Sequence, residues 1–309
     1  MARDNFADRL MAFIAEKNSR VCVGLDPRPD DLPECIAPED GRPGPVVEAV
    51  VRLCARVLFS TAEYAAAVKL QSAFFEQLGM AGLVAFFRLA EAARDHGLIT
   101  IADVKRCDVG STAEAYAEAY LACGCGGPAF DAVTVTPYLG SDSMAPFLRQ
   151  AEEWGRGLFV VVRASNPSAA ELQDLRLDDG RLVHEAVADL VVDWGADLVG
   201  DSGYSSVGAV VGATAREHLA ALRERMPLQP FLVPGYGAQG GAAEDVVEAF
   251  DGAGLGAVVN SSRGIMYAYK GEPYAERYGS DGFAAAAGAA ARDMRDAING
   301  ALEGAGKLP

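Results

Sequence analysis

Short apolar runs alternate with longer amphipathic segments along most of this chain. An apolar run bounded by polar residues is typical of a buried β-strand. The runs lie at residues 21–25, 65–70, 98–104, 132–136, 158–163, 198–200, 231–233 and 257–260. About eight strand–helix units in succession predict an α/β fold, a (β/α)8 TIM barrel, because a doubly wound sheet usually has fewer strands.

Several segments between and before the strands predict helices. Residues 5–17 have the apolar spacing of an amphipathic helix, which we expect to cover one end of the core. A helix at 80–95 is closed by Gly97, and one at 111–121 opens on serine, threonine and glutamate start signals.

The remaining segments read as additions to the barrel. They are a proline-rich stretch at 27–45, a polar insert at about 168–181, and a terminal helix rich in alanine and glycine at 283–302. None of them has the size or pattern of a separate domain. We therefore expect residues 1–309 to form a single barrel domain with its core at about 21–265.

Composition limits the possible partners. The formal net charge of −16 opposes binding to nucleic acid or anionic membranes, and no basic run provides a local exception. No apolar stretch reaches the ~18 residues of a membrane span, and the N-terminus lacks a signal-peptide core, so we expect a cytoplasmic protein. The six cysteines predict reduced thiols, and the three histidines lie away from any motif, which disfavours a histidine triad or metal site.

Charged side chains follow the third predicted strand. Residues alternate between two faces along a strand, so Asp103 and Lys105 share the face of Ile99 and Ile101. Asp108 lies in the following loop, where its carboxylate can reach a neighbouring site or subunit. The apolar strand directly before this DxKxxD run favours a chemical role over a solvated surface pair.

The first and second strands also end in charge. Asp26 follows the first strand, and Lys69 lies late in the second. In a barrel, the groups that do chemistry lie where the strands pass into their following loops. Three successive strands therefore supply candidate catalytic charges.

Glycine-rich loops follow the seventh and eighth strands. Residues 235–240 match GxGxxG, which indicates a dinucleotide fold when it follows the first strand of a domain, whereas here it lies late in the chain. In this position the loop instead suits a phosphate, which backbone amides and a helix N-terminus can approach. After the eighth strand, Arg263 offers a planar fork of donors for phosphate oxygens.

Together these motifs resemble the orotidine 5'-phosphate decarboxylase family, in its longer bacterial branch. The likeness rests on DVKRCD at 103–108, on Lys69, and on the loops PGYGAQGG and NSSRGI, and it runs over about 21–265. The resemblance implies a homodimer that converts orotidine 5'-monophosphate into uridine 5'-monophosphate and CO2 in pyrimidine biosynthesis. It implies neither a metal nor an organic cofactor.

The resemblance also implies a role for each matched residue. Lys69, Asp103 and Lys105 would form a charged array with Asp108 of the partner subunit, and Lys105 would donate the proton. The implied substrate contacts are Asp26 at the ribose, Thr112 across the dimer interface, Ser165 at the pyrimidine edge, Gln239 and Arg263 at the phosphate, and Pro234, Gly235 and Ser262 elsewhere on the substrate. Ser165 is placed by its position after the fifth strand more than by a motif.

Three other functions stay open. A metal-dependent relative would act on a phosphorylated sugar acid through the same DxKxxD strand, although it needs an acidic ligand where this chain has Lys69. A non-catalytic barrel would bind a nucleotide without turnover. A Schiff-base aldolase would use Lys105 and form an adduct that borohydride traps.

Overall fold

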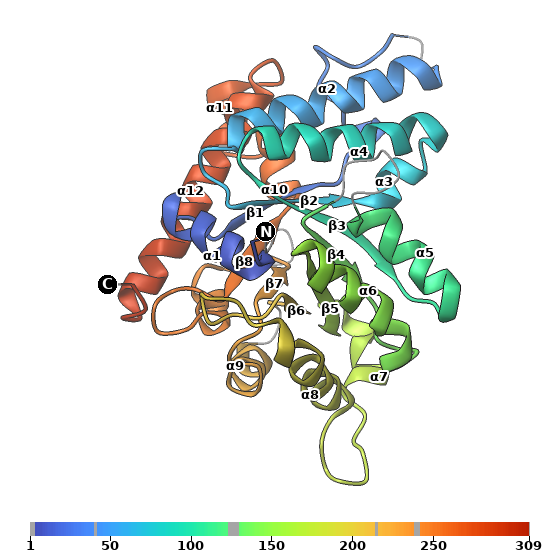
Figure 1. The fold of residues 1–309 in the computed structure, drawn as a ribbon. Helices are drawn as coiled ribbons and strands as arrows, with labels where there is room; N and C mark the ends of the chain where they lie inside the picture. Colours follow the sequence, from blue (N-terminus) through green and yellow to red (C-terminus); the bar gives the residue numbers. More distant parts are fainter. Residues whose placement is uncertain (1–3, 40–41, 123–129, 214–215, 238–241, 309) are drawn as a thin grey trace.

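Eight parallel strands form a closed barrel in this computed structural model, which describes residues 4–39, 42–122, 130–213, 216–237 and 242–308. Each strand pairs with the next one in the chain, and β8 pairs with β1 (Figure 1). The strands are β1 Val21–Leu25, β2 Ala67–Gln71, β3 Ile99–Arg106, β4 Ala132–Val135, β5 Gly157–Arg163, β6 Val207–Val211, β7 Phe231–Pro234 and β8 Ala257–Ser261. The predicted (β/α)8 barrel is confirmed.

The prediction of the sixth strand at 198–200 is wrong. That run begins at the last residue of a short 3-10 helix, η3 (Ala196–Leu198), and Val199 forms an isolated antiparallel bridge with Ser205. The strand is β6 instead, in which every residue is buried, whereas Val199 is 40% exposed. The runs at 198–200 and 207–211 are both short and apolar. The sequence pattern therefore does not show which of them pairs with a neighbouring strand on each side.

Helices surround the barrel, as Figure 1 shows. The α-helices are α1 Phe6–Glu16, α2 Pro43–Thr61, α3 Ser72–Glu76, α4 Gly79–Asp95, α5 Gly110–Leu121, α6 Ser141–Trp154, α7 Ala170–Gln173, α8 Val183–Gly195, α9 Arg216–Arg225, α10 Arg263–Met266, α11 Tyr274–Tyr278 and α12 Phe283–Gly304. Among them, α1, α4, α5 and α12 confirm the four helices predicted above. Gly97 has φ +66°, a conformation that favours glycine, directly after α4. No helix within the described residues has the length and apolar character needed to span a bilayer.

One end of the barrel is closed by α1. Phe6, Leu10 and Ile14 of this helix are fully buried in a cluster with residues of the strands, and Phe6 packs edge-on against Phe159 at 5.8 Å between ring centroids. Asn5 caps the helix, because its side-chain oxygen accepts a hydrogen bond from the Ala7 amide at 2.7 Å. The opposite end, where the strands finish, remains open for a site.

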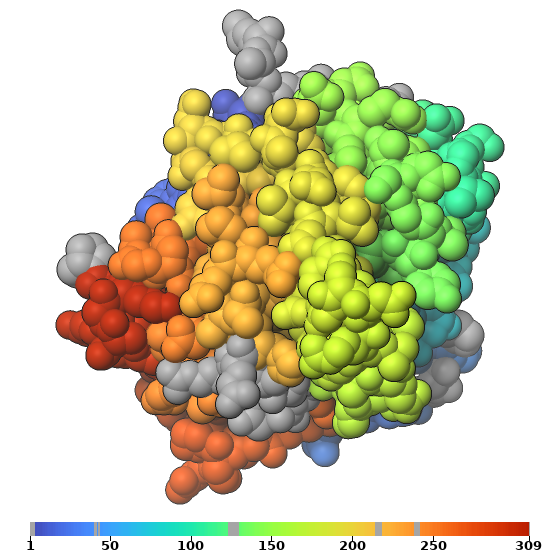
Figure 2. All heavy atoms as spheres, turned by 90° about the horizontal axis from the view of Figure 1, so that it is seen from below, coloured from blue at the N-terminus to red at the C-terminus, as the bar shows by residue number. Residues whose placement is uncertain are grey.

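The polar insert expected after the fifth strand lies between β5 and α8. It contains the 3-10 helix η2 (Pro167–Ala169), α7, and a turn closed by an antiparallel bridge between Arg176 and Leu182. Seen from below, it forms a yellow-green lobe on the surface of the molecule (Figure 2). The insert starts directly at the carboxyl end of β5 and therefore borders the open end of the barrel.

Candidate active site

A cavity of about 330 Å³ opens at the carboxyl ends of the strands. It is lined by Asp26, Lys69, Gln71, Asp103, Lys105, Val161, Ala164, Ser165, Asn166, Val210, Leu232, Pro234, Gly235, Tyr236, Asn260, Ser262 and Arg263. Nine of the twelve residues predicted for the site are among them. Of the other three, Asp108 and Thr112 do not line this cavity, and Gln239 lies outside the described residues.

Four donors surround the carboxylate of Asp103, which is 5% exposed. Its Oδ1 lies 2.5 Å from Lys105 Nζ and accepts a hydrogen bond from the Thr134 hydroxyl at 2.9 Å. Its Oδ2 lies 2.8 Å from Lys69 Nζ and accepts a hydrogen bond from Gln71 Nε2 at 2.9 Å. Because two ammonium groups and two neutral donors share this carboxylate, its position and its negative charge are both fixed.

The buried charges hold one another in the ionised state. Burial by itself would lower the pKa of Lys69, but the carboxylates of Asp103 and Asp26 raise that pKa above its ordinary value. Burial would likewise raise the pKa of Asp103, yet the ammonium groups of Lys69 and Lys105 hold it well below its usual range. The centre of the site therefore carries fixed charges of both signs at neutral pH.

A bulge in β3 brings Lys105 to the cavity. Ala102 pairs with Val133 and Arg106 with Val135, so β3 has more residues than β4 between these two pairs. Lys105 lies in this stretch with φ +45°, a left-handed conformation that is uncommon for a residue with a side chain. Asp103 and Lys105 thus both line the cavity, as their shared face predicted, although the strand between them is irregular.

Thr134 of β4 satisfies the backbone of this bulge. Its buried hydroxyl oxygen accepts hydrogen bonds from the amides of Val104 and Lys105, both at 3.0 Å. With both acceptor positions used, its one hydroxyl proton is left for Asp103. The same hydroxyl therefore fixes the backbone of the DxK run and the carboxylate within it.

The first and eighth strands meet on the other side of the cavity. Asp26 Oδ1 lies 3.5 Å from Lys69 Nζ, and Asn260 donates a hydrogen bond to the Ser262 hydroxyl at 3.3 Å. A β-carbon at Gly24 would lie 1.9 Å from Ser262 Oγ, so the absence of a side chain at Gly24 lets Ser262 approach β1. The Oδ1 atom of Asn260 is buried without a hydrogen-bond partner within the described residues, which leaves an acceptor for a bound molecule.

Three polar strand residues of the site were not assigned a role from the sequence. They are Gln71, Thr134 and Asn260, which lie in or at the end of the apolar runs that predict β2, β4 and β8. A polar residue inside an otherwise apolar strand is a signal for such a position, because an unpaired polar group is costly to bury.

Asp108 and Thr112 lie beyond the end of β3. Asp108 is half-buried and its carboxylate accepts a hydrogen bond from the amide of Val109 at 2.8 Å, while Thr112 is exposed in the first turn of α5. This helix begins at Gly110 with no side-chain cap, so Ser111 and Thr112 are not the N-cap that the start signals suggested. Neither of the two predicted interface residues thus lines the cavity of its own chain.

Comparisons with known proteins give one consistent result. Residues 19–278 match the family described as "Orotidine 5'-phosphate decarboxylase / HUMPS family". The chain is 43% identical over 302 residues to the orotidine 5'-phosphate decarboxylase of Rhodopirellula baltica, covering 96% of this chain and 99% of that protein. It is 42% identical over 301 residues to the corresponding protein of Roseiflexus castenholzii, covering 96% and 98%. Among solved structures, Leishmania donovani OMP decarboxylase aligns with a TM-score of 0.74 at 33% identity, covering 96% of this chain and 98% of that one.

Proposed function

This chain belongs to the orotidine 5'-phosphate decarboxylase / HUMPS family, and from that premise we propose how its residues carry out the decarboxylation. The enzyme is a carboxy-lyase that removes CO2 from orotidine 5'-monophosphate (OMP) in pyrimidine biosynthesis. The observation that carries the proposal is the ion-paired series Lys69, Asp103 and Lys105 in the cavity lining, in which Lys69 and Asp103 are buried and Lys105 is partly exposed.

Lys105 supplies the positive charge and the proton. Loss of the ring carboxylate leaves an electron pair in an sp2 orbital that no carbonyl is placed to delocalise, so a cation is needed beside that carbon. Both lysines line the cavity, but the side chain of Lys105 is 46% exposed, whereas that of Lys69 is 6% exposed. The Lys105 ammonium can stabilise the developing carbanion and then protonate it.

Asp103 acts as a fixed charge and not as a base. All four of its contacts come from donors, so a proton taken from substrate would have to displace one of them. Its role is to hold the Lys105 ammonium at one position in the cavity. Preorganised charges of this kind need no rearrangement during the reaction.

The phosphate of OMP lies at the loops after β7 and β8. Arg263 is exposed at the start of α10 and lines the cavity together with Ser262, Pro234 and Gly235. We place the phosphate against Arg263 and Gln239, with Asp26 at the ribose and Ser165 at the pyrimidine edge. Binding energy gained at the phosphate, remote from the reacting carbon, can be used to orient the base.

A homodimer completes the site in this proposal, with Asp108 and Thr112 reaching the cavity of the other subunit. Large apolar side chains are exposed on the segments that follow β2, β3 and β4, and one of them, Val109, directly follows Asp108. They are Met80, Val84, Val109, Tyr138 and Leu139. An apolar surface of this kind is typical of a protein interface, and it supports a partner on this side of the barrel.

The alternatives fit the geometry less well. Schiff-base chemistry needs a free amine, whereas Lys105 is ion-paired with Asp103 at 2.5 Å. Lys69 occupies the position where a metal-dependent relative needs an acidic ligand, and within the described residues no three potential metal-binding side chains converge.

The test is an ultraviolet absorbance assay of OMP turnover with a chelator present. We expect rapid decarboxylation by the wild type and near-complete loss in Lys105→Ala. Tight OMP binding without turnover by the wild type would favour the nucleotide-binding barrel, and activity lost to the chelator would favour the metal-dependent relative. Trapping of a borohydride adduct would favour the aldolase.

A further inference from the structure

The loop directly after β5 carries Ser165 into the cavity. Within the described part of the chain the Ser165 hydroxyl has no hydrogen-bond partner, so it is available to a ligand. A hydroxyl on a loop recognises a ligand well only if the loop backbone is held in place. The contacts around Ser165 show that its backbone is restrained from two sides.

The polar insert holds the residue before Ser165. The side-chain oxygen of Gln173 accepts a hydrogen bond from the Ala164 amide at 2.9 Å. The guanidinium of Arg163 donates to the Ala164 carbonyl at 2.8 Å and lies 3.4 Å from the same Gln173 oxygen. Both backbone polar groups of Ala164 are thus bound by these two side chains.

The side chains of Gln173 and Arg163 thus form a clamp on Ala164. Two further residues hold this clamp in place. Asp174 pairs with the Arg163 guanidinium at 2.9 Å. The buried ring of His184, in the first turn of α8, donates from Nδ1 to the Gln173 carbonyl at 2.8 Å and lies 3.2 Å from the second oxygen of Asp174. The backbone and side chain of Gln173 are therefore both anchored.

Gly212, which follows β6, also restrains Ser165. The Gly212 amide donates to the Arg163 carbonyl at 2.8 Å. A β-carbon at Gly212 would lie 2.8 Å from the Ser165 β-carbon and 2.9 Å from its α-carbon. Ser165 can occupy its observed position only because residue 212 has no side chain.

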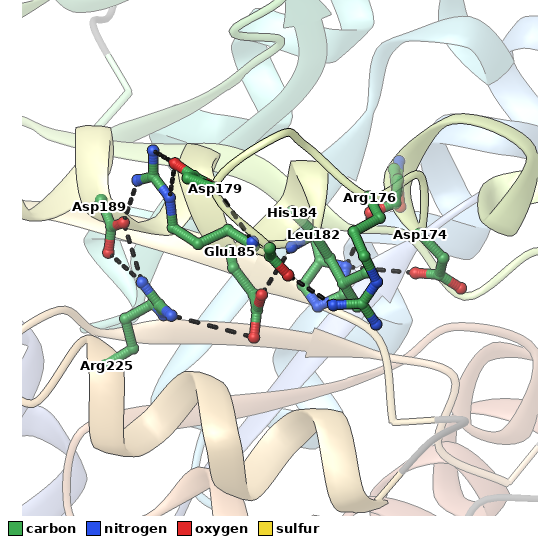
Figure 3. Close-up of polar contacts among 11 residues, drawn as sticks. Asp174, Arg176, Asp179, Leu182, His184, Glu185, Asp189 and Arg225 are labelled. Carbon is green, nitrogen blue, oxygen red and sulfur yellow. Dashed lines mark hydrogen bonds and ion pairs between the residues drawn. The ribbon is translucent and has the colours of Figure 1, made fainter.

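A second group of ion pairs in the insert lies away from this clamp. Arg181 contacts Asp179 at 2.5 Å and Asp189 at 2.7 Å, and Asp189 pairs with Arg225 at 2.6 Å. Figure 3 shows Asp189 and Arg225 at the left of the view and Asp174 at the right, with His184 between them. Arg181 is 40% exposed, so this outer group offers a matched control within the same insert.

We propose that Gln173 and Arg163 are positioning residues: they clamp the loop after β5 so that the Ser165 hydroxyl meets the pyrimidine edge of OMP. The inference rests on the base contact proposed above for Ser165. The proposal assigns the polar insert a function in substrate recognition.

The test is a double-mutant cycle on kcat/KM for OMP. Gln173→Met keeps the length of the side chain but removes the acceptor, so we expect a loss of about 10- to 100-fold, as for other small misplacements. Gln173→Glu retains an acceptor oxygen and restores most of the activity. In a Ser165→Ala background, Gln173→Met has little further effect, because the clamp acts through the hydroxyl that is already missing.

Two more variants complete the experiment. Arg181→Ala breaks the outer ion pairs and leaves kcat/KM unchanged. Gly212→Ala lowers kcat/KM because its added methyl group displaces Ser165, although it removes no hydrogen-bonding group. This second variant keeps the test valid should Gln173→Met not fold. Equal losses from Gln173→Met with and without Ser165 would overturn the proposal. Wild-type kinetics in Ser165→Ala would refute the base contact and the clamp with it, while decarboxylation through Lys105 would stand.

Discussion

Replacement of Thr134 by valine tests how the DxK run is held. Valine has nearly the shape of threonine but lacks the hydroxyl, so the change removes three hydrogen bonds and leaves the packing of β4 intact. The amides of Val104 and Lys105 lose their acceptor, and Asp103 loses one of its four donors. All of these groups lie in the bulge of β3.

The expected cost follows from these three contacts. A buried polar group left without a partner costs ~1–3 kcal/mol, and a hydrogen bond to a charged group contributes ~1.5–3 kcal/mol. Allowing for partial relaxation, we expect the free energy of unfolding to fall by about 3–6 kcal/mol. Because Lys105 then loses its fixed backbone and a fixed partner, kcat falls by up to about 100-fold as well.

Urea unfolding and the absorbance assay measure the two effects, with Thr134→Ser as the matched control. Serine keeps the hydroxyl and loses one methyl group, so its cost in unfolding free energy is about 1 kcal/mol and its kcat stays near the wild-type value. If the valine and serine variants had the same stability and the same kcat, the hydroxyl of Thr134 would not hold the bulge.

Three further predictions concern the charged groups. Lys105→Ala loses at least about 1000-fold in kcat while its circular dichroism spectrum stays native, because Lys105 combines charge stabilisation with proton transfer; a smaller loss would assign the proton to another group. Arg263→Ala folds normally and loses about 100-fold in kcat/KM, the equivalent of two charge-assisted hydrogen bonds at ~1.5 kcal/mol each, and unchanged kinetics would remove Arg263 from the phosphate site. The pKa of Asp103 is lower in the folded state, so its contribution to stability is present above the ordinary carboxyl pKa of about 4 and is lost as the pH falls. The difference in unfolding free energy between wild type and Asp103→Asn therefore shrinks on acidification, and a constant difference would contradict this linkage.

The sequence predicts most of the fold because the strands are short, apolar and regularly spaced. β1 matches its prediction at both ends, and β3 and β8 differ from theirs by one or two residues. β6 is the exception. A run that contains glycine and alanine among its valines has a weak strand signal, and its place in the barrel depends on pairing with β5 and β7, which a local pattern does not contain.

The site is predicted in part, for a related reason. Alternation along β3 correctly places Asp103 and Lys105 near each other, but it assumes a regular strand. The bulge and the left-handed conformation of Lys105 depend on Thr134, which lies on the next strand and is distant in sequence. The sequence therefore indicates which residues carry charge, whereas the neutral residue that orients them becomes evident from the three-dimensional contacts.

The distribution of charge in the cavity separates binding from chemistry. In the described lining, Lys69 and Lys105 face Asp26 and Asp103, so this part of the site has no net charge and Arg263 at the far end supplies the excess cation. The partner's Asp108 would make the chemical end net negative, which disfavours binding of the carboxylate that is to be lost. Affinity for an anionic substrate must then come from the phosphate end. The overall charge of −16 on the chain also opposes binding of an anion, so this local cation is needed. In the proposed dimer, such an arrangement would destabilise the bound carboxylate relative to the carbanion and would use phosphate binding to offset the cost, so the phosphate loops would contribute to catalysis as much as Lys105.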